Sequence, residues 1–201
     1  MSKINYYYRR FIEKYKAYRT KKTVDLSDIT LISQNCIGGV MYHDCGAKFL
    51  SPTVNLFIMP HDFMKFVENN AEKYLSGTPI VKDGEKYPIG ELSDGIKINF
   101  MHYETKEEAL EKWEQRKQRI NKKKIFVICI ERDGFDEEAF DAFKKIPYPK
   151  ALFTRNIKWK DEKDCIFMPQ YESEEQVPDL IPNRMMYYKN ILPKMIKKAF
   201  D

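Results

Sequence analysis

The strongest constraint on the fold is the run Ile125–Ile130, six apolar residues in succession and rich in β-branched side chains. A strand that is apolar at every position must be covered on both faces, and parallel sheets lying between layers of helices provide that cover. This run therefore predicts the central strand of a layered α/β domain. Helices are expected on both faces of a mostly parallel or mixed sheet.

Shorter apolar runs alternate with helical patterns along the rest of the chain, which is typical of the same architecture. Further strands are expected at 29–33, 54–59, 96–101, 151–153 and 165–168. A short β-hairpin insertion is expected within 79–92, around the Asp83-Gly84 turn. Helices are expected at 39–48, 60–75, 105–121, 135–145 and 184–200, the third with a Thr105/Glu108 capping box and the last interrupted by Pro193.

The first 22 residues form a separate basic and aromatic helix in this interpretation, and residues 23–201 form a single α/β domain. Aromatic residues recur at helical spacing within 3–22, and Lys and Arg fill many of the remaining positions. Such a helix could lie on an anionic membrane surface. Packing of its aromatic face against the domain is the favoured interpretation, because its tyrosines outnumber its aliphatic residues.

Composition and motifs restrict the class of protein further. No run approaches the length of about 18 apolar residues that a membrane span needs, and no signal-peptide core is present. We therefore expect a cytoplasmic protein. It would be peripheral to the inner face of the membrane if residues 3–22 bind there. The four cysteines show no zinc spacing, which predicts free thiols in a reducing compartment. The balance of 35 basic against 30 acidic residues does not indicate nucleic acid. Neither GxGxxG nor a P-loop occurs.

Polar and reactive side chains follow five of the expected strands. The carboxyl ends of parallel strands share one edge of a sheet, so these side chains could converge there. We therefore expect an active site at that edge. The five segments are Gln34-Asn35-Cys36, Pro60-His61-Asp62, His102-Tyr103-Glu104, Glu131-Arg132-Asp133 and Thr154-Arg155-Asn156.

Cys36 is the candidate nucleophile of this site. The glycine pair after it leads into a helix, whose N-terminus would lower the pKa of the thiol and whose backbone amides could form an oxyanion hole. The alternative is a small buried thiol at a strand end. His102 is the candidate base, with helix capping or packing as its alternative. Asp133 or Glu131 could orient the histidine and complete a Cys-His-carboxylate arrangement.

A glycosyl transfer from a nucleotide sugar is the alternative reaction. Glu131 and Asp133 would then hold Mg²⁺ or Mn²⁺ on the diphosphate, because hard oxygen ligands suit these ions; otherwise we expect no metal and no cofactor. Arg116 and Arg119 could grip a phosphate or carboxylate, or pair with glutamates on a solvated face. The candidate substrate-binding residues are Gln34, Asn35, Gly38, Gly39, Tyr103, Arg116, Arg119, Arg132 and Arg155.

A set of short motifs between residues 28 and 172 carries a family resemblance. They include Ser33–Gly39, Ser51–Val54, Asp62–Phe66, Phe100–Tyr103, Lys112-Trp113, Arg116, Arg119–Asn121, Arg132-Asp133 and Phe153-Thr154. Together they resemble an uncharacterised bacterial family described as exopolysaccharide biosynthesis proteins, although Ile37 replaces the aromatic residue usual after the cysteine. The cysteine and the later histidine are also similar to those of a family described as papain-like cysteine peptidases.

The first resemblance implies a role in building surface glycans, with a sugar or sugar nucleotide as the small-molecule partner. It leaves three functions open. These are acyl transfer or hydrolysis by Cys36 and His102, a nucleotide-sugar-dependent glycosyltransferase, and a non-catalytic partner of glycan assembly that docks on a membrane through residues 3–22. It assigns no catalytic residue, and the oligomeric state stays open.

Overall fold

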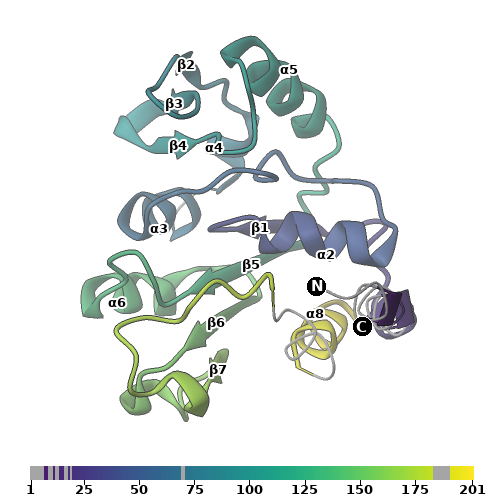
Figure 1. Cartoon of the computed structure of the whole chain (residues 1–201), viewed down its shortest axis with the longest axis vertical. Coiled ribbons are helices and arrows are strands. Elements are labelled where there is room, and N and C mark those ends of the chain that lie inside the picture. Colours follow the sequence, from purple (N-terminus) through teal and green to yellow (C-terminus); the bar gives the residue numbers. More distant parts are fainter. Residues whose placement is uncertain are drawn as a thin grey trace.

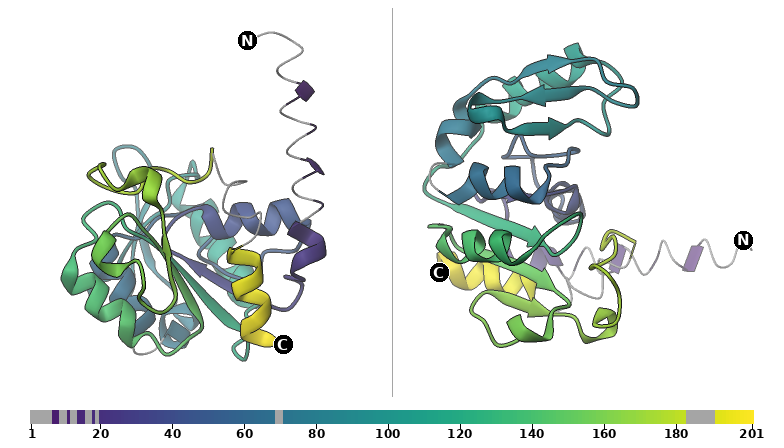
Figure 2. Two further views of the ribbon diagram at one scale, coloured as in Figure 1. Left: turned by 90° about the horizontal axis from the view of Figure 1, so that it is seen from below. Right: turned by 90° about the vertical axis from the view of Figure 1, so that its left-hand side faces the viewer.

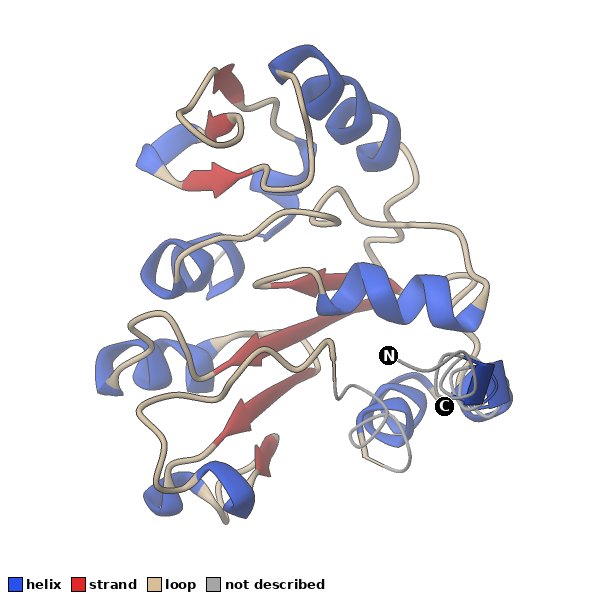
Figure 3. Cartoon of the chain, viewed as in Figure 1, coloured by secondary structure: helices blue, strands red, loops and turns tan. Residues whose placement is uncertain are grey.

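A parallel sheet with strand order β1–β5–β6–β7 forms the centre of the computed structural model (Figures 1 and 3). The structure describes residues 7, 8, 11, 14, 15, 18, 20–68, 71–182 and 191–201. The four strands of this sheet are β1 (Thr30–Ser33), β5 (Ile125–Ile130), β6 (Lys150–Thr154) and β7 (Cys165–Phe167). In the register of the sheet, Ser33 pairs with Ile128, and Ile130 pairs with Phe153.

The central strand β5 is buried at all six positions, as the sequence predicts. Val127 and Cys129 belong to one core cluster, whereas Phe126, Ile128 and Ile130 belong to the other. This alternation follows from the two-residue period of a strand. Helices cover both faces (Figure 2, left), with α3 (Pro60–Glu68) and α6 (Glu137–Lys145) on the first core and α2 (Ile37–Cys45) and α8 (Leu192–Phe200) on the second. The layered α/β class is confirmed.

A small antiparallel sheet lies beside the main one and forms the upper part of the molecule in Figure 2, right. Its strands are β2 (Ile80–Lys82), β3 (Ile89–Glu91) and β4 (Lys97–Asn99), in that order. The expected hairpin is therefore present, but the expected strand at 96–101 belongs to this sheet rather than to the main one. The neighbouring helices are α4 (Ala71–Ser76) and α5 (Lys106–Lys117), and short 3-10 turns occur at Ser93–Gly95, Ile157–Trp159 and Pro169–Tyr171.

The predicted strand at 54–59 is wrong. Asn55 adopts a left-handed conformation with φ 63°, which interrupts an extended backbone, and Phe57 alone forms a bridge, to Asn99. The segment nevertheless fills the space between the two sheets. Ile58 N donates to Gln34 O at 2.9 Å, and Phe57 N donates to Asn99 O at 2.9 Å. Val54, Leu56 and Ile58 are buried because they pack between the sheets and not because they pair within one.

Several helix boundaries also differ from the prediction. The expected helix 60–75 is divided into α3 and α4, with residues 69–70 outside the described part. Thr105 Oγ1 accepts from Glu108 N at 3.1 Å as expected, but α5 ends at Lys117. Pro193 lies in the first turn of α8, a position that suits proline. Residues 184–190 lie outside the described part.

The N-terminal helix is described at residues 7, 8, 11, 14, 15 and 18 and from 20 to 23, all of them helical. The predicted packing of its aromatic face on the domain is wrong for the described aromatic residues, which are 52–70% exposed. The end of the helix is fixed to the domain, since Thr20 and Val24 are buried. Within the described ranges, no helix is both long enough and apolar enough to cross a membrane.

Candidate functional site

A cavity of about 490 Å³ opens at the carboxyl ends of β1 and β5. This volume lies within the range of about 300–1,000 Å³ that is usual for ligand sites. Five separate parts of the chain contribute to it, including the turn after β4 and the loop that precedes residue 183. The lining residues are Asn35, Cys36, Phe57, Met101, His102, Arg132, Asp133, Asp179 and Ile181.

Gln34 holds the ends of β1 and β5 together and does not line the cavity. Its backbone N donates to Ile128 O at 3.2 Å, and its side-chain Oε1 accepts from Ile130 N at 3.2 Å. Its carbonyl accepts from Ile58 N, so all three of these groups are used within the protein. Gln34 is 1% exposed and has a structural role in place of the substrate contact expected for it.

The glycine pair allows α2 to pack closely against its neighbours. A Cβ atom at Gly38 would lie 2.6 Å from Ser33 Oγ, and one at Gly39 would lie 2.8 Å from Val54 Cγ1. Both distances are shorter than real Cβ contacts, so no larger residue fits without movement. Gly38 and Gly39 are buried and do not line the cavity, so the structure gives them a packing role.

The backbone amides after Cys36 are already hydrogen bonded. Ile37 N donates to Asn35 Oδ1 at 3.1 Å, and Gly38 N donates to Ser33 Oγ at 3.2 Å. These two amides therefore do not form the expected oxyanion hole. Asn35 is half-buried and lines the cavity, and its Oδ1 is held by Ile37 N.

Cys36 lies at the N-cap position of α2 and is 6% exposed. Burial, followed by the negative charge of Asp179, raises the pKa of the Cys36 thiol to about 11. A buried thiolate loses its hydration, and this loss outweighs the backbone hydrogen bond that acts to lower the pKa. Sγ lies 3.8 Å from Leu56 O, to which the thiol donates. The resting thiol is protonated at neutral pH, contrary to the expected lowering of its pKa.

His102 and Asp133 reach the cavity from different directions. His102 is exposed in the turn after β4 and so comes from the small sheet. Asp133 follows β5 in a left-handed conformation with φ 57°, and its Oδ2 accepts from Arg132 Nε at 2.8 Å. Its backbone N donates to Gln176 Oε1 at 2.8 Å. The three expected catalytic residues thus line one cavity, but the carboxylate is paired with Arg132.

Three other expected substrate ligands support the segment that follows α2. Tyr103 OH donates to Val54 O at 2.8 Å and accepts from Arg116 Nη1, which also donates to Val54 O at 3.1 Å. The Arg116 guanidinium lies over the ring of Phe49, with Cζ 5.3 Å from the ring centroid. Arg119 Nη1 donates to Phe49 O at 3.5 Å. None of these three side chains lines the cavity.

Glu131 is a buried carboxylate that organises the end of β6. Its Oε2 accepts from Thr154 Oγ1 at 2.5 Å, from Arg155 N at 2.8 Å and from Asn156 N at 3.1 Å. The Arg155 side chain pairs with Glu131 Oε1 at 3.5 Å, so it too lies outside the cavity lining. Among the described residues, no group of three or more His, Cys, Asp or Glu side chains is arranged to hold a metal ion.

Four lining residues escape the sequence analysis: Phe57, Met101, Asp179 and Ile181. Phe57 lies inside one expected strand and Met101 is the last residue of another, and the loop carrying Asp179 and Ile181 shows no periodicity or motif. The proline residues around Asp179 indicate a loop and give no sign of a site.

The fold and the cavity together define a layered α/β protein with a ligand-sized site at the carboxyl edge of its parallel sheet. The chain belongs to the family Domain of unknown function (DUF1919), whose model matches residues 7–200. It is also 32% identical over 152 residues to an "Uncharacterized protein" of Haemophilus influenzae (strain ATCC 51907 / DSM 11121 / KW20 / Rd). That match covers 76% of this chain and 73% of the relative.

Proposed function

We propose that this protein is an enzyme of exopolysaccharide biosynthesis that transfers or hydrolyses an acyl group on a sugar-containing substrate. The observation that carries the proposal is that Cys36, His102 and Asp133 line one cavity although they come from three separate parts of the chain. A thiol and an imidazole in one cavity are the pair that nucleophilic acyl transfer requires. The glycan context comes from the sequence resemblance, and the reaction is placed in the cytosol, where free thiols stay reduced.

The charges of the lining favour a neutral polar substrate over a nucleotide diphosphate. Arg132 is paired with Asp133, and among the described lining residues Asp179 adds a second carboxylate without a second arginine or lysine. Carboxylates accept hydrogen bonds from sugar hydroxyls and repel phosphates. We therefore favour acyl chemistry over the nucleotide-sugar alternative, and the proposed reaction uses no cofactor. The alternative would use Mg²⁺ or Mn²⁺.

The apolar part of the lining also suits a sugar. Phe57, Met101 and Ile181 supply a wall against which the C–H face of a sugar ring can pack. A few polar groups within a largely apolar wall are the usual composition of small-molecule sites. The side chains of Asn35 and Asp179 then provide hydrogen-bond partners for the hydroxyl groups.

In the proposed reaction, His102 takes the thiol proton while the Cys36 sulfur attacks the acyl carbonyl. The ester C–O bond then breaks, and the proton passes from His102 to the departing alcohol. Water or an acceptor hydroxyl attacks the thioester and restores the thiol. Because the resting thiol is protonated, its proton moves to the imidazole only when the substrate is in place. The Asn35 side-chain amide is the donor that we assign to the oxyanion.

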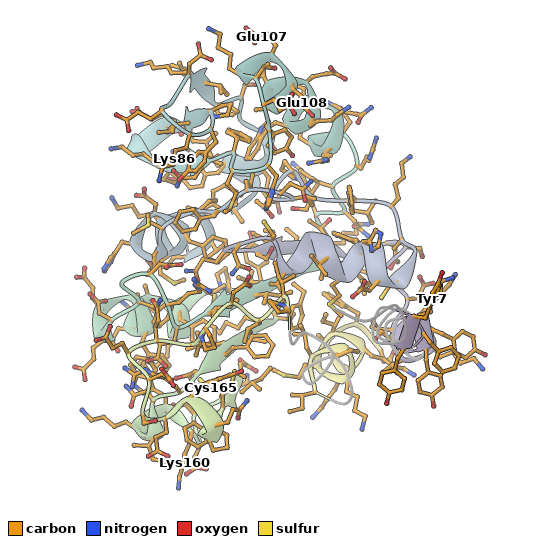
Figure 4. The ribbon with its side chains drawn as sticks, viewed as in Figure 1. Tyr7, Lys86, Glu107, Glu108, Lys160 and Cys165 are labelled. Carbon is orange, nitrogen blue, oxygen red and sulfur yellow. The ribbon has the colours of Figure 1, made fainter. Side chains whose placement is uncertain are left out.

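Acetylation by p-nitrophenyl acetate tests this proposal. We expect intact-mass and peptide analysis after rapid quenching to find an acetyl group on Cys36, and we expect none there in Cys36→Ala. His102→Gln should slow acetylation by about 10²-fold or more, the usual contribution of a general base. Cys165→Ala is the matched control, since Cys165, which is labelled in Figure 4, lies on β7 and outside the cavity lining.

The result that would overturn the proposal is unchanged ester turnover in Cys36→Ala, with circular dichroism showing that the variant is folded. Calorimetric titration with a nucleotide sugar and Mn²⁺ separates the alternative reaction. Saturable heat in that titration, together with unacetylated Cys36, would replace acyl transfer by glycosyl transfer.

A further inference from the structure

The positive charge of the protein is concentrated in its first 22 residues. This stretch contains eight Lys or Arg residues and one acidic residue, Glu13, whereas the whole chain has a net charge of +5. Residues 23–201 therefore carry a net charge of −2, and the first 22 carry +7. A charge separation of this size between a terminal helix and its domain indicates that the helix meets an anionic partner.

The same helix presents aromatic side chains to solvent. The described aromatic residues Tyr7, Tyr8, Phe11, Tyr15 and Tyr18 are 67%, 64%, 70%, 52% and 56% exposed. At 3.6 residues per turn these five positions fall within an arc of about 100°, so they form one stripe, which we call the aromatic stripe. Figure 4 shows the ring of Tyr7 pointing away from the ribbon of the domain. Large rings grouped on an exposed face indicate an interaction surface.

Basic residues lie beside this aromatic stripe. By helical geometry, Lys14 and Lys21 fall within about 40° of its edge, and both are in the described part of the helix. Lys22 Nζ lies 4.7 Å from the centroid of the Tyr18 ring, so a cation is held directly over one of the rings. The surface thus combines rings with ammonium groups and does not present either kind alone.

Among its described residues, the helix is buried against the domain at its end. Exposure falls from 56% at Tyr18 to 3% at Thr20, and Val24 N donates to Thr20 O at 3.1 Å. Val24 and Leu26 continue into the core. An attachment of this kind leaves the described rings of the aromatic stripe accessible.

We propose that the N-terminal helix docks the protein on the surface of an anionic lipid bilayer. Tyrosine and phenylalanine rings prefer the boundary between lipid headgroups and acyl chains, and lysine and arginine are attracted to anionic headgroups. A lipid surface uses both features of this helix at once, as interfacial amphipathic helices do. A nucleic-acid duplex would use the positive charge but not a continuous stripe of rings along one face. This inference is independent of the reaction proposed for the cavity.

Vesicle flotation of the full chain tests the proposal. We expect it to float with vesicles that contain phosphatidylglycerol, to bind much less to pure phosphatidylcholine, and to lose binding as salt screens the charges. The quadruple variant Tyr8→Ser, Phe11→Ser, Tyr15→Ser and Tyr18→Ser keeps every charge and should bind about tenfold or more weakly. Ile80→Ser is the matched control, since Ile80 is 69% exposed on the small sheet. This variant should bind the vesicles as well as the unaltered protein does.

Three results would overturn the proposal: no flotation of the unaltered protein, equal binding to both lipid compositions, or unchanged binding of the quadruple variant. Dimerisation that is abolished by the quadruple variant in size-exclusion chromatography would assign the aromatic stripe to a second copy of the chain. Circular dichroism shows whether each variant is folded. Acetylation of Cys36 by an ester should be the same in the quadruple variant, which separates this test from that of the cavity reaction.

Discussion

The protonation of Cys36 can be measured through its pH-dependent alkylation. The pKa of this thiol is raised from 9.0 to about 11, first by burial and then by Asp179. Only the thiolate reacts, so at any pH below 9 the reactive fraction is about a hundredfold smaller than in an ordinary cysteine. Between pH 7 and 10 the rate with iodoacetamide should therefore rise about tenfold per pH unit without levelling off near pH 9.

Peptide mass spectrometry can follow alkylation of Cys36 separately from the other cysteines, with unfolded protein as the reference that levels off near pH 9. The shape of the pH profile is the readout, because poor access slows the reaction equally at every pH. Asp179→Asn removes the negative charge that adds to the raised pKa of Cys36, so it should increase the alkylation rate below pH 9. The increase should be less than a hundredfold, since the burial of the thiol remains. Asp161→Asn, at an exposed position outside the cavity lining, is the control. A plateau near pH 9 in the folded protein would refute the reasoning.

Three further predictions concern stability. Gly39→Ala should lower the free energy of unfolding by about 1–3 kcal/mol in urea titrations, because the added Cβ would lie 2.8 Å from Val54 Cγ1. The loss should be smaller in a Val54→Ala background, and equal losses in both backgrounds would contradict this explanation. Gln34→Leu should lower the free energy of unfolding by about 1–3 kcal/mol, because it leaves the buried Ile130 N–H unpaired. Gln170→Leu, at an exposed position, should change this free energy little. The free energy of unfolding should also fall as pH rises from 9 towards 12. Burial raises the pKa of Cys45 to about 12, so in this range the folded state keeps a proton that the unfolded state loses. A melting temperature that stays constant over this pH range would contradict this linkage.

The sequence is sufficient to predict the main layers of the fold, because the relevant signals are local. Ile125–Ile130 can be buried at every position only inside a sheet covered on both faces, and this is what the structure shows. The segment 54–59 has the same apolar character but is not a strand. Its burial comes from two sheets that meet around it, and single-chain periodicity does not contain that long-range information.

The location of the cavity is predictable, but only part of its lining is. Cys36 and Asp133 follow β1 and β5, and adjacent parallel strands bring their ends together. His102 reaches the same cavity through the small sheet, so its position was expected for the wrong topological reason. Arg116 and Tyr103 belong to the motifs noted in the sequence, and both hold the backbone at Val54; a motif does not distinguish such support from ligand contact.

The segment between the two sheets has a mechanical consequence for ligand binding. It is hydrogen bonded to the small sheet through Phe57 and to the end of β1 through Ile58. The side of the cavity that carries His102 and the side that carries Cys36 are thereby joined into a single frame. We therefore expect the opening to keep its width when a ligand binds, so that selection depends on fit to a preformed shape more than on closure of two lobes around the ligand.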